Sequence, residues 1–170
     1  MQALITFFFE LCLLRRAPQD LPASDTLFRL ILIADVAVGV LVGVASGLQT
    51  LASAAQVVAE TALMLSLLYL ALGLVGHPGR FTQSATALLG SGALIGALAL
   101  APVLLSALGG DTDAAALGTL LLLALMVWNI AINGHILRHT FGIGLGQGIG
   151  IAVVYELLAI VTMSALFGGL

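Results

Sequence analysis

Charged residues are scarce in this chain. Only 8% of its 170 residues are acidic or basic, none is lysine, and 61% are hydrophobic, which gives a mean hydropathy of +1.22. Water-soluble domains usually carry about 25% charged residues, so this chain has too little polar surface to cover a globule in water. The composition therefore excludes the soluble class, and five arginines without lysine exclude a basic surface that binds nucleic acid.

Cysteine and the common enzyme motifs are also nearly absent. Cys12 stands alone, which excludes an intramolecular disulfide and a Cys-x-x-Cys redox pair. The chain contains neither a G-x-S-x-G nor an H-E-x-x-H motif. Its glycine-rich segment FGIGLGQGIG, residues 141–150, does not fit the G-x-G-x-x-G spacing of dinucleotide-binding loops. We therefore expect a protein that is not an enzyme and that holds no cofactor and no metal.

Long apolar runs are what the chain has in abundance. A bilayer core of about 30 Å needs roughly 20 apolar residues per helical crossing, and five runs reach that length. The polar breaks between them are short, so neighbouring helices should be antiparallel. The sequence predicts an all-α polytopic protein with a single membrane domain over residues 1–170 and transmembrane helices at 27–48, 50–75, 82–108, 114–137 and 143–166.

The first 16 residues are apolar but too short to span a bilayer. Gln2, Thr6 and Glu10 recur every four residues, so a helix over residues 1–16 would place a polar stripe beside an apolar face with three phenylalanines. This pattern is typical of an amphipathic helix in the membrane interface, with the phenylalanines among the acyl chains. A dimerisation or partner-binding helix is the alternative. Residues 17–26 are expected to form a proline-marked cytoplasmic linker.

The arginines indicate the orientation of the chain. If it crosses the membrane five times, all five arginines fall on the side of the N-terminal segment and none falls on the other side. By the positive-inside rule that side is cytoplasmic. We therefore expect an inner-membrane protein with a cytoplasmic N-terminus and an extracytoplasmic C-terminus. The basic and histidine residues expected at the cytoplasmic face are Arg15, Arg16, Arg29, His77, Arg80, His135, Arg138 and His139.

Glycines recur every four residues in three of the predicted helices. Such rows of small residues let helix backbones approach each other closely in lipid. Tight helix packing is the interpretation that we favour, and a gating hinge is the alternative. The rows are Gly39, Gly43 and Gly47 on the first helix, Gly92 and Gly96 on the third, and Gly142, Gly146 and Gly150 on the fifth, where Gly144 and Gly148 form a second row.

Three carboxylic acids lie at membrane depth, where ionisable side chains are costly and are functional candidates by default. Amides accompany them at helical spacing, so the second, fourth and fifth helices can each turn polar side chains towards the interior of the bundle. The predicted polar cluster comprises Asp35, Gln56, Glu60, Asn129, Asn133, Tyr155 and Glu156. It indicates either a path for protons or cations, or carboxyls and amides that hold the helices together by hydrogen bonds.

Two histidines share a face at the cytoplasmic end of the fourth predicted helix. His135 and His139 are four residues apart, a spacing that suits a metal or a haem. His77 lies on the same side of the membrane, but no third ligand is evident near the pair. Anchoring in the interface beside Arg138 is the alternative interpretation.

The layout of the whole chain resembles the Yip1 family of small five-helix membrane proteins, in particular its bacterial branch. The resemblance rests on the proline-rich start LLRRAPQDLPAS, the five closely spaced helices and the segment WNIAINGHILRHTF before the last helix. The D-L-Y-G-P signature of eukaryotic members is absent, so binding to small GTPases is not implied. The resemblance implies a non-catalytic membrane protein that organises partners or a membrane process.

Three functional hypotheses follow from the sequence. The first is an inner-membrane scaffold or accessory protein that contacts membrane lipid and a membrane-protein partner, or assembles as a homo-oligomer through its glycine-rich faces. The second is a small transporter or channel, coupled to protons or cations, that uses the intramembrane carboxylates. The third is a haem- or metal-binding membrane subunit that uses His135 and His139.

The arginine distribution predicts a topology that reporter fusions can test. Alkaline phosphatase, which becomes active outside the cytoplasm, should be active when fused to the C-terminus and inactive when fused after Gly79. Green fluorescent protein should give the opposite pattern at the same two positions. Phosphatase activity at Gly79 together with fluorescence at the C-terminus would contradict the predicted orientation.

Overall fold

Five long helices and a short N-terminal helix make up the protein. The computed structural model describes residues 2–110 and 112–168. Each long helix has the length and apolar composition needed to cross a membrane. The described residues are thus all-α, and their five long helices are those that a multi-pass membrane protein requires. The long helices are α2 (Asp25–Ala45), α3 (Thr50–Leu74), α4 (Phe81–Leu108), α5 (Asp113–Phe141) and α6 (Leu145–Phe167). The short helix is α1 (Gln2–Cys12), and 3₁₀ turns η1 (Pro18–Asp20) and η2 (Pro78–Arg80) follow α1 and α3.

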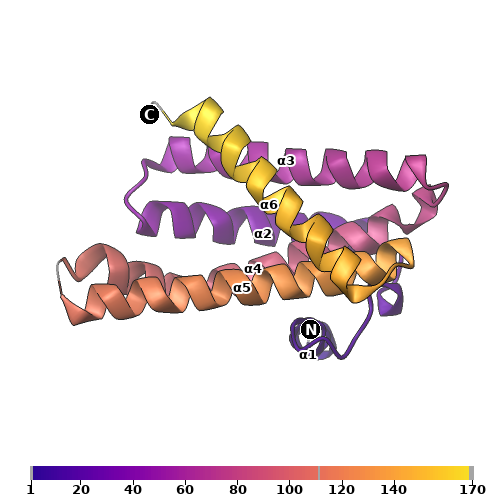
Figure 1. Ribbon diagram of the computed structural model, residues 1–170, viewed down its shortest axis with the longest axis horizontal. Helices are drawn as coiled ribbons and strands as arrows, with labels where there is room; N and C mark the ends of the chain where they lie inside the picture. Colours follow the sequence, from indigo (N-terminus) through magenta and orange to yellow (C-terminus); the bar gives the residue numbers. More distant parts are fainter. Residues whose placement is uncertain (1, 111, 169–170) are drawn as a thin grey trace.

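Successive long helices run in opposite directions. Figure 1 shows α1 and the α3–α4 and α5–α6 turns at one end of the bundle, on the right, and the α2–α3 and α4–α5 turns at the other. All five arginines therefore belong to the end that holds α1, as the five-crossing prediction requires. Helix α4 is the central element and packs mainly on α2 and α5, whereas α6 crosses the bundle obliquely and packs mainly on α5.

The helix boundaries differ from the prediction chiefly at the end of α5. The segment RHTFG was expected to be a break after residue 137, but α5 continues through Arg138 to Phe141. No helix-breaking residue precedes Gly142, and the Thr140 hydroxyl bonds to the Ile136 carbonyl within the same helix. The helix ends at Gly142 because its φ of 69° is left-handed, a conformation that glycine adopts at little cost. Helix α6 consequently begins at Leu145 and not at residue 143.

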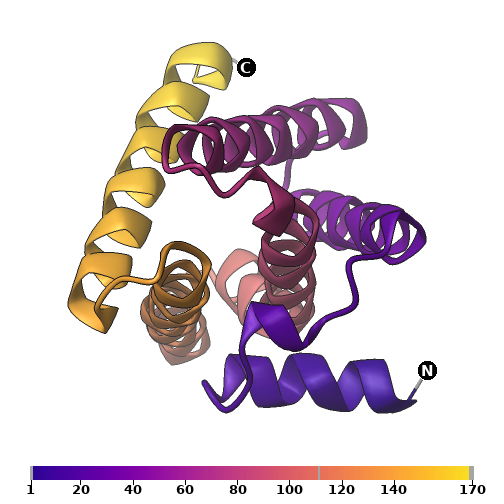
Figure 2. The same ribbon diagram turned by 90° about the vertical axis from the view of Figure 1, so that its right-hand side faces the viewer.

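Helix α1 lies across the arginine-bearing end of the bundle, roughly perpendicular to the long helices (Figure 2). It ends at Cys12 and not at residue 16. The expectation that its three phenylalanines lie among acyl chains is wrong for Phe8, which is 6% exposed and packs on α4 at Gly90. Glycine at position 90 leaves room for the ring. Phe7 is partly buried, and Phe9 is 47% exposed.

The lone thiol lies in the hydrophobic core, where α1 packs against the long helices. Cys12 is buried beside Leu11, and burial raises the pKa of its thiol to about 11. The thiolate is the reactive form of cysteine. At neutral pH Cys12 therefore stays protonated and acts as a small apolar side chain.

The glycine rows on α2 and α4 lie where helices approach each other. A Cβ at Gly39 or Gly43 would collide with Val57 or Ser53 of α3, and one at Gly96 would lie 2.9 Å from a methyl group of Val38. Ser53 uses this proximity to donate a hydrogen bond to the Val40 carbonyl of α2 at 3.1 Å. Gly47 differs from its row because it lies beyond the end of α2.

The row Gly142, Gly146 and Gly150 does not pack against another helix of the chain. Nothing lies within 4 Å of a Cβ built at any of the three among the described residues. The close approach occurs on the neighbouring row, where the backbone of Gly148 meets the Gly134 carbonyl of α5. The sequence identified the helix but could not distinguish the two faces, because both rows have the same four-residue spacing.

The two rows of α6 predict opposite effects of alanine. Gly148→Ala should lower the stability of the purified protein by about 1–3 kcal/mol, because the new methyl group collides with backbone that cannot rotate away. Gly150→Ala should leave stability unchanged or raise it by up to about 1 kcal/mol, because alanine favours the helix. Thermal unfolding in detergent, followed by circular dichroism, measures both. Equal effects of the two substitutions would contradict the assigned packing face.

Candidate functional site

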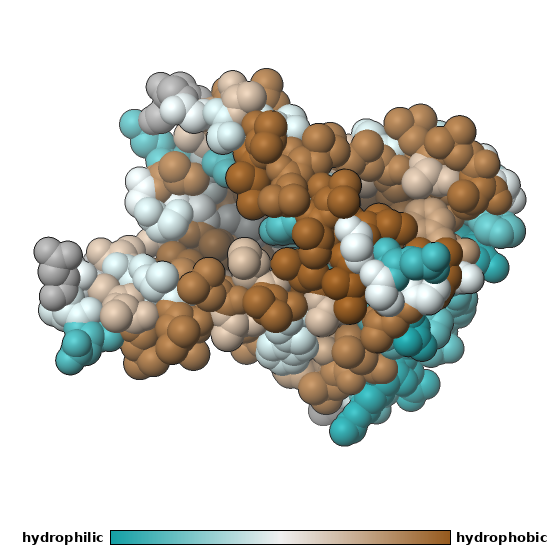
Figure 3. Space-filling model, viewed as in Figure 1, coloured by the Kyte–Doolittle hydropathy of each residue, from teal (hydrophilic) through white to brown (hydrophobic). Residues whose placement is uncertain are grey.

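A polar cavity of about 220 Å³ lies among the five long helices. Every long helix contributes to its wall, so residues far apart in the sequence meet there. On the face shown in Figure 3, apolar side chains surround a hollow in which hydrophilic surface is visible. We call the space the acidic cavity, after its carboxyl side chains. Its polar lining residues are Asp35, Glu60, Thr61, Asn129, Asn133, Tyr155 and Glu156.

Helical periodicity places these side chains on the cavity wall. Asn129 and Asn133 are one turn apart on α5 and therefore share a face. Glu60 and Thr61 lie on the inner face of α3, and Tyr155 and Glu156 on that of α6. The sequence predicted that polar residues of α3, α5 and α6 converge. The structure brings all of the predicted residues on these helices to the cavity except one amide.

That exception is Gln56. It lines a separate cavity of about 300 Å³ with Gln49 and Phe167, towards the α2–α3 turn. The α3 face that lines the acidic cavity is formed by Val57, Glu60, Thr61 and Met64, and at 100° per residue Gln56 lies at its edge. The expected path is thus divided between two cavities.

Glycines keep the acidic cavity open. Gly39, Gly92 and Gly96 all line it. A Cβ at Gly92 would lie only 3.0 Å from Oδ1 of Asp35, so the absence of a side chain on α4 makes room for this carboxyl on α2. Part of the glycine pattern that the sequence suggested for helix packing therefore also shapes the cavity.

The carboxyl groups in the cavity have no compensating charge. No arginine or histidine lines it, and within residues 2–110 and 112–168 the single ion pair is Arg16–Glu10 in the N-terminal segment. Oδ1 of Asn129 is buried and has no hydrogen-bond partner within those residues. Because an uncompensated charge or an orphaned polar atom in a low-dielectric interior is costly, the lining is suited to a proton, a cation or water.

Several lining residues were not anticipated from the sequence. Thr61 is the residue after Glu60, Met64 lies one turn after Glu60, and Val57 lies one turn before it. Helical spacing from Glu60 was therefore sufficient to find them. Leu88 and Leu89 on α4 carry no such signal, because they are two leucines in a long apolar run.

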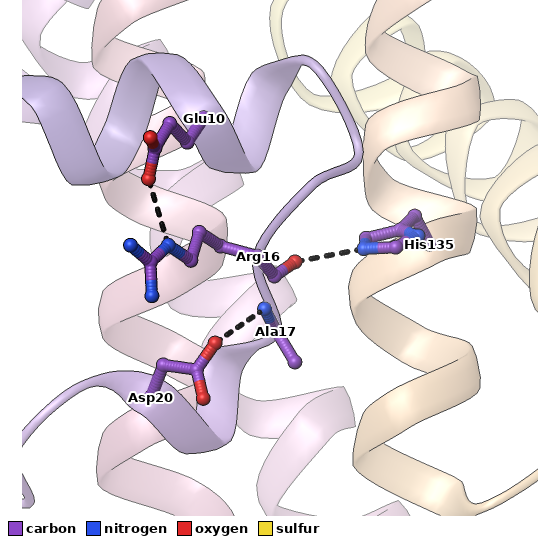
Figure 4. A network of polar contacts seen from close by, with 5 residues as sticks. All are labelled: Glu10, Arg16, Ala17, Asp20 and His135. Carbon is purple, nitrogen blue, oxygen red and sulfur yellow. Dashed lines mark hydrogen bonds and ion pairs between the residues drawn. The ribbon is translucent and has the colours of Figure 1, made fainter.

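Three of the eight residues predicted at the cytoplasmic face, Arg16, His135 and His139, take part in the contacts of the N-terminal arm, which we define as residues 2–21. Figure 4 shows the Arg16 side chain directed to Glu10, with Nε to Oε2 at 2.7 Å, while its carbonyl faces the His135 ring at 2.8 Å. The Ala17 amide donates to Asp20. Polar contacts therefore join residues within the arm to each other and join the arm to α5.

Further hydrogen bonds attach the arm to α4 and α5. Trp128 Nε1 donates to the Cys12 carbonyl at 2.9 Å. The Gln19 amide donates to the His139 carbonyl at 2.7 Å, and Gln83 of α4 donates to the Leu21 carbonyl at 2.6 Å. Trp128, Gln19 and Gln83 were not among the predicted site residues, and nothing in their spacing indicated these contacts.

The histidine pair takes part in this attachment. The rings of His135 and His139 lie 4.7 Å apart and edge to face. Nε2 of His135 faces the Arg16 carbonyl, and Nε2 of His139 accepts from Nε of Arg138 at 3.2 Å. The described part of the chain contains no group of three His, Cys, Asp or Glu placed to hold a metal. The pair thus serves packing and the arm in this structure.

The other basic residues of this end are more dispersed. Arg80 donates from Nη1 to the Thr140 carbonyl at 2.8 Å and so joins the start of α4 to the end of α5. His77 is exposed before η2. Arg15 and Arg29 are exposed as well.

Comparisons with known proteins do not identify a relative. No family model, no curated protein and no solved structure matches the chain. The chemistry of the site therefore has to be argued from its own residues.

The cavity predicts a sharp difference between two adjacent residues of α3. In a Cys12→Ala background, Thr61→Cys should react with a water-soluble, cationic methanethiosulfonate reagent, because position 61 faces the acidic cavity. Ala62→Cys should not react, because residue 62 is exposed on the outer surface of the bundle, where lipid covers it. The anionic reagent should react with position 61 at least tenfold more slowly, since carboxylates repel it. Equal labelling at 61 and 62 would contradict a polar cavity.

Proposed function

We propose that this protein is a small membrane transporter or channel that binds and conducts protons or monovalent cations. One observation carries the proposal: Asp35, Glu60 and Glu156, from three different helices, line one open cavity among the five long helices. Ionisable residues inside a membrane are retained chiefly at substrate and ion pathways. The geometry therefore favours the hypothesis that the sequence alone placed second.

The lining offers suitable ligands for such a cargo. Carboxylate and amide oxygens are hard ligands that bind alkali cations and water well, and a carboxyl can also take up and release a proton. Asn129 and Asn133 add neutral oxygens, and Oδ1 of Asn129 is buried without a hydrogen-bond partner among the described residues. A proton or a cation in the cavity would neutralise the carboxyl groups and remove the cost of burying them.

The second polar cavity extends this arrangement towards one end of the bundle. Gln49 and Gln56 line it near the α2–α3 turn. Gln56 is one helical turn from Glu60, which faces the acidic cavity. We infer that the two cavities are successive stations of one pathway, and that the extracytoplasmic side of the membrane lies beyond Gln49.

A Yip1-like, non-catalytic scaffold in the inner membrane is our second proposal. It is supported by the N-terminal arm, where the exposed apolar side chains of Ile5, Phe9 and Leu13 are followed in the chain by Arg15 and Arg16. Apolar residues beside arginines suit the interface of an anionic leaflet. In this proposal α1 rests on the cytoplasmic surface of the membrane, or contacts a membrane-protein partner or a second copy of the chain.

Flux measurements decide between the two proposals. Proteoliposomes that contain the native protein should pass protons or a monovalent cation faster than empty liposomes. Glu60→Gln and Glu156→Gln should each reduce the flux at least tenfold, because glutamine keeps the shape of the side chain but cannot ionise. Glu10→Gln, which changes an acid outside the cavity, is the matched control and should leave the flux unchanged.

Flux at the level of empty liposomes, from variants and native protein that all fold, would reject the transporter. The carboxyls would then act as clasps between helices, and the scaffold would become the leading proposal. Flux that persists in both glutamine variants would reject the assigned residues.

A further inference from the structure

An apolar cavity of about 290 Å³ adjoins the acidic cavity. The two share Met64, Leu88, Asn133 and Tyr155 in their walls. Beyond these residues the second cavity, which we call the apolar chamber, is lined almost entirely by hydrocarbon and by one aromatic ring. Its other lining residues include Ala71, Phe141, Ile151, Val154 and Leu158.

The chamber reaches the outer surface of the bundle. Val154 is 65% exposed, and Ile151 and Leu158 are also exposed, although all three line the chamber. Helix α3 and helix α6 meet at only a few points, so they leave the chamber open between them. In a membrane this opening faces the acyl chains, and a molecule dissolved in the bilayer can reach the chamber sideways.

We propose that the cargo is an amphipathic organic cation, an amine or quaternary ammonium group that carries an apolar chain. Its positive head lies in the acidic cavity near Asp35, Glu60 and Glu156, and its chain lies in the apolar chamber. This inference rests on the proposed transport function and names the class of substrate.

Charge and shape together select this class. Three carboxyl side chains without a lining arginine or histidine favour a positive head and oppose an anionic one. Asn129 and Asn133 line the same cavity, and amide oxygens can accept from the N–H donors of a primary amine. An alkali cation gains no favourable contact from an adjoining apolar space. The chain of an amphipathic cation, in contrast, fills this space and enters it from the lipid.

Binding of a defined probe tests the inference. Dodecyltrimethylammonium, radiolabelled and kept below its micelle concentration, is added to the full chain in phosphatidylcholine nanodiscs, and empty nanodiscs provide the background. The native protein should show saturable binding. Glu60→Gln and Glu156→Gln should each weaken binding at least tenfold, because they remove the charge that faces the head.

Two matched pairs separate the head from the chain. Ala71→Phe fills the apolar chamber and should weaken binding at least tenfold, whereas Ala62→Phe, also on α3 but outside both cavities, should not change it. Tetramethylammonium, which is the head alone, should compete at least tenfold less well than the probe. Dodecyl sulfate, which has the same chain and the opposite charge, should not compete.

The outcomes distinguish this inference from the proposed function. Proton or cation flux that depends on Glu60, together with no saturable binding of the probe, would overturn the inference and leave the transporter in place. Absence of both flux and binding would overturn both. Binding that dodecyl sulfate displaces, or that Ala71→Phe does not alter, would show an apolar space filled without regard to charge and would also overturn the inference.

Discussion

The whole structure depends on one constraint: polar groups inside the hydrocarbon of a membrane have no water to bond with. Backbone amides and carbonyls must therefore be paired within each crossing, which makes every crossing a helix. The same constraint applies to side chains. Asp35, Glu60, Asn129, Asn133 and Glu156 cannot face lipid without a large penalty, so the helices that carry them are oriented towards a common interior.

Close packing around α4 is what holds that interior together. Residues 84–91 of this helix are buried without interruption, and small residues there let α1, α2 and α5 come near. Ser84 and Thr140 join α4 to α5 by a hydrogen bond of 2.9 Å between their hydroxyl groups. Packing of small residues with a few polar links is the usual way in which membrane helices associate, because lipid provides no hydrophobic force between them.

The sequence predicted the number, order and approximate limits of the membrane-crossing helices, because hydropathy and helix length are local properties. It also predicted six of the seven members of the polar cluster, since amphipathic spacing limits which faces can meet. It did not reveal which of two equally spaced glycine rows on α6 packs, nor that Gln56 lies in another cavity. Those features depend on how each helix is rotated about its own axis, which only the neighbouring helices decide.

The sequence pattern also gave no indication of the contacts that the N-terminal arm makes with the bundle. Trp128 and Gln83 donate to backbone carbonyls of the arm, and Gln19 of the arm donates to a backbone carbonyl of α5. Every residue carries a carbonyl, so the sequence does not mark the acceptor. The burial of Phe8 follows from Gly90, a single residue outside the four-residue rows on which the sequence argument depended.

The N-terminal arm is attached mainly to two of the long helices, α4 and α5. Its hydrogen bonds reach α4 and α5, and α2 packs closely on α4, so these three helices form the most closely packed part of the molecule. Helices α3 and α6, which carry Glu60 and Glu156, have few contacts with each other. The packing between them is much less extensive than the packing of α4 on α2 or on α5. Two of the three acids of the cavity thus lie on the two long helices outside this closely packed part.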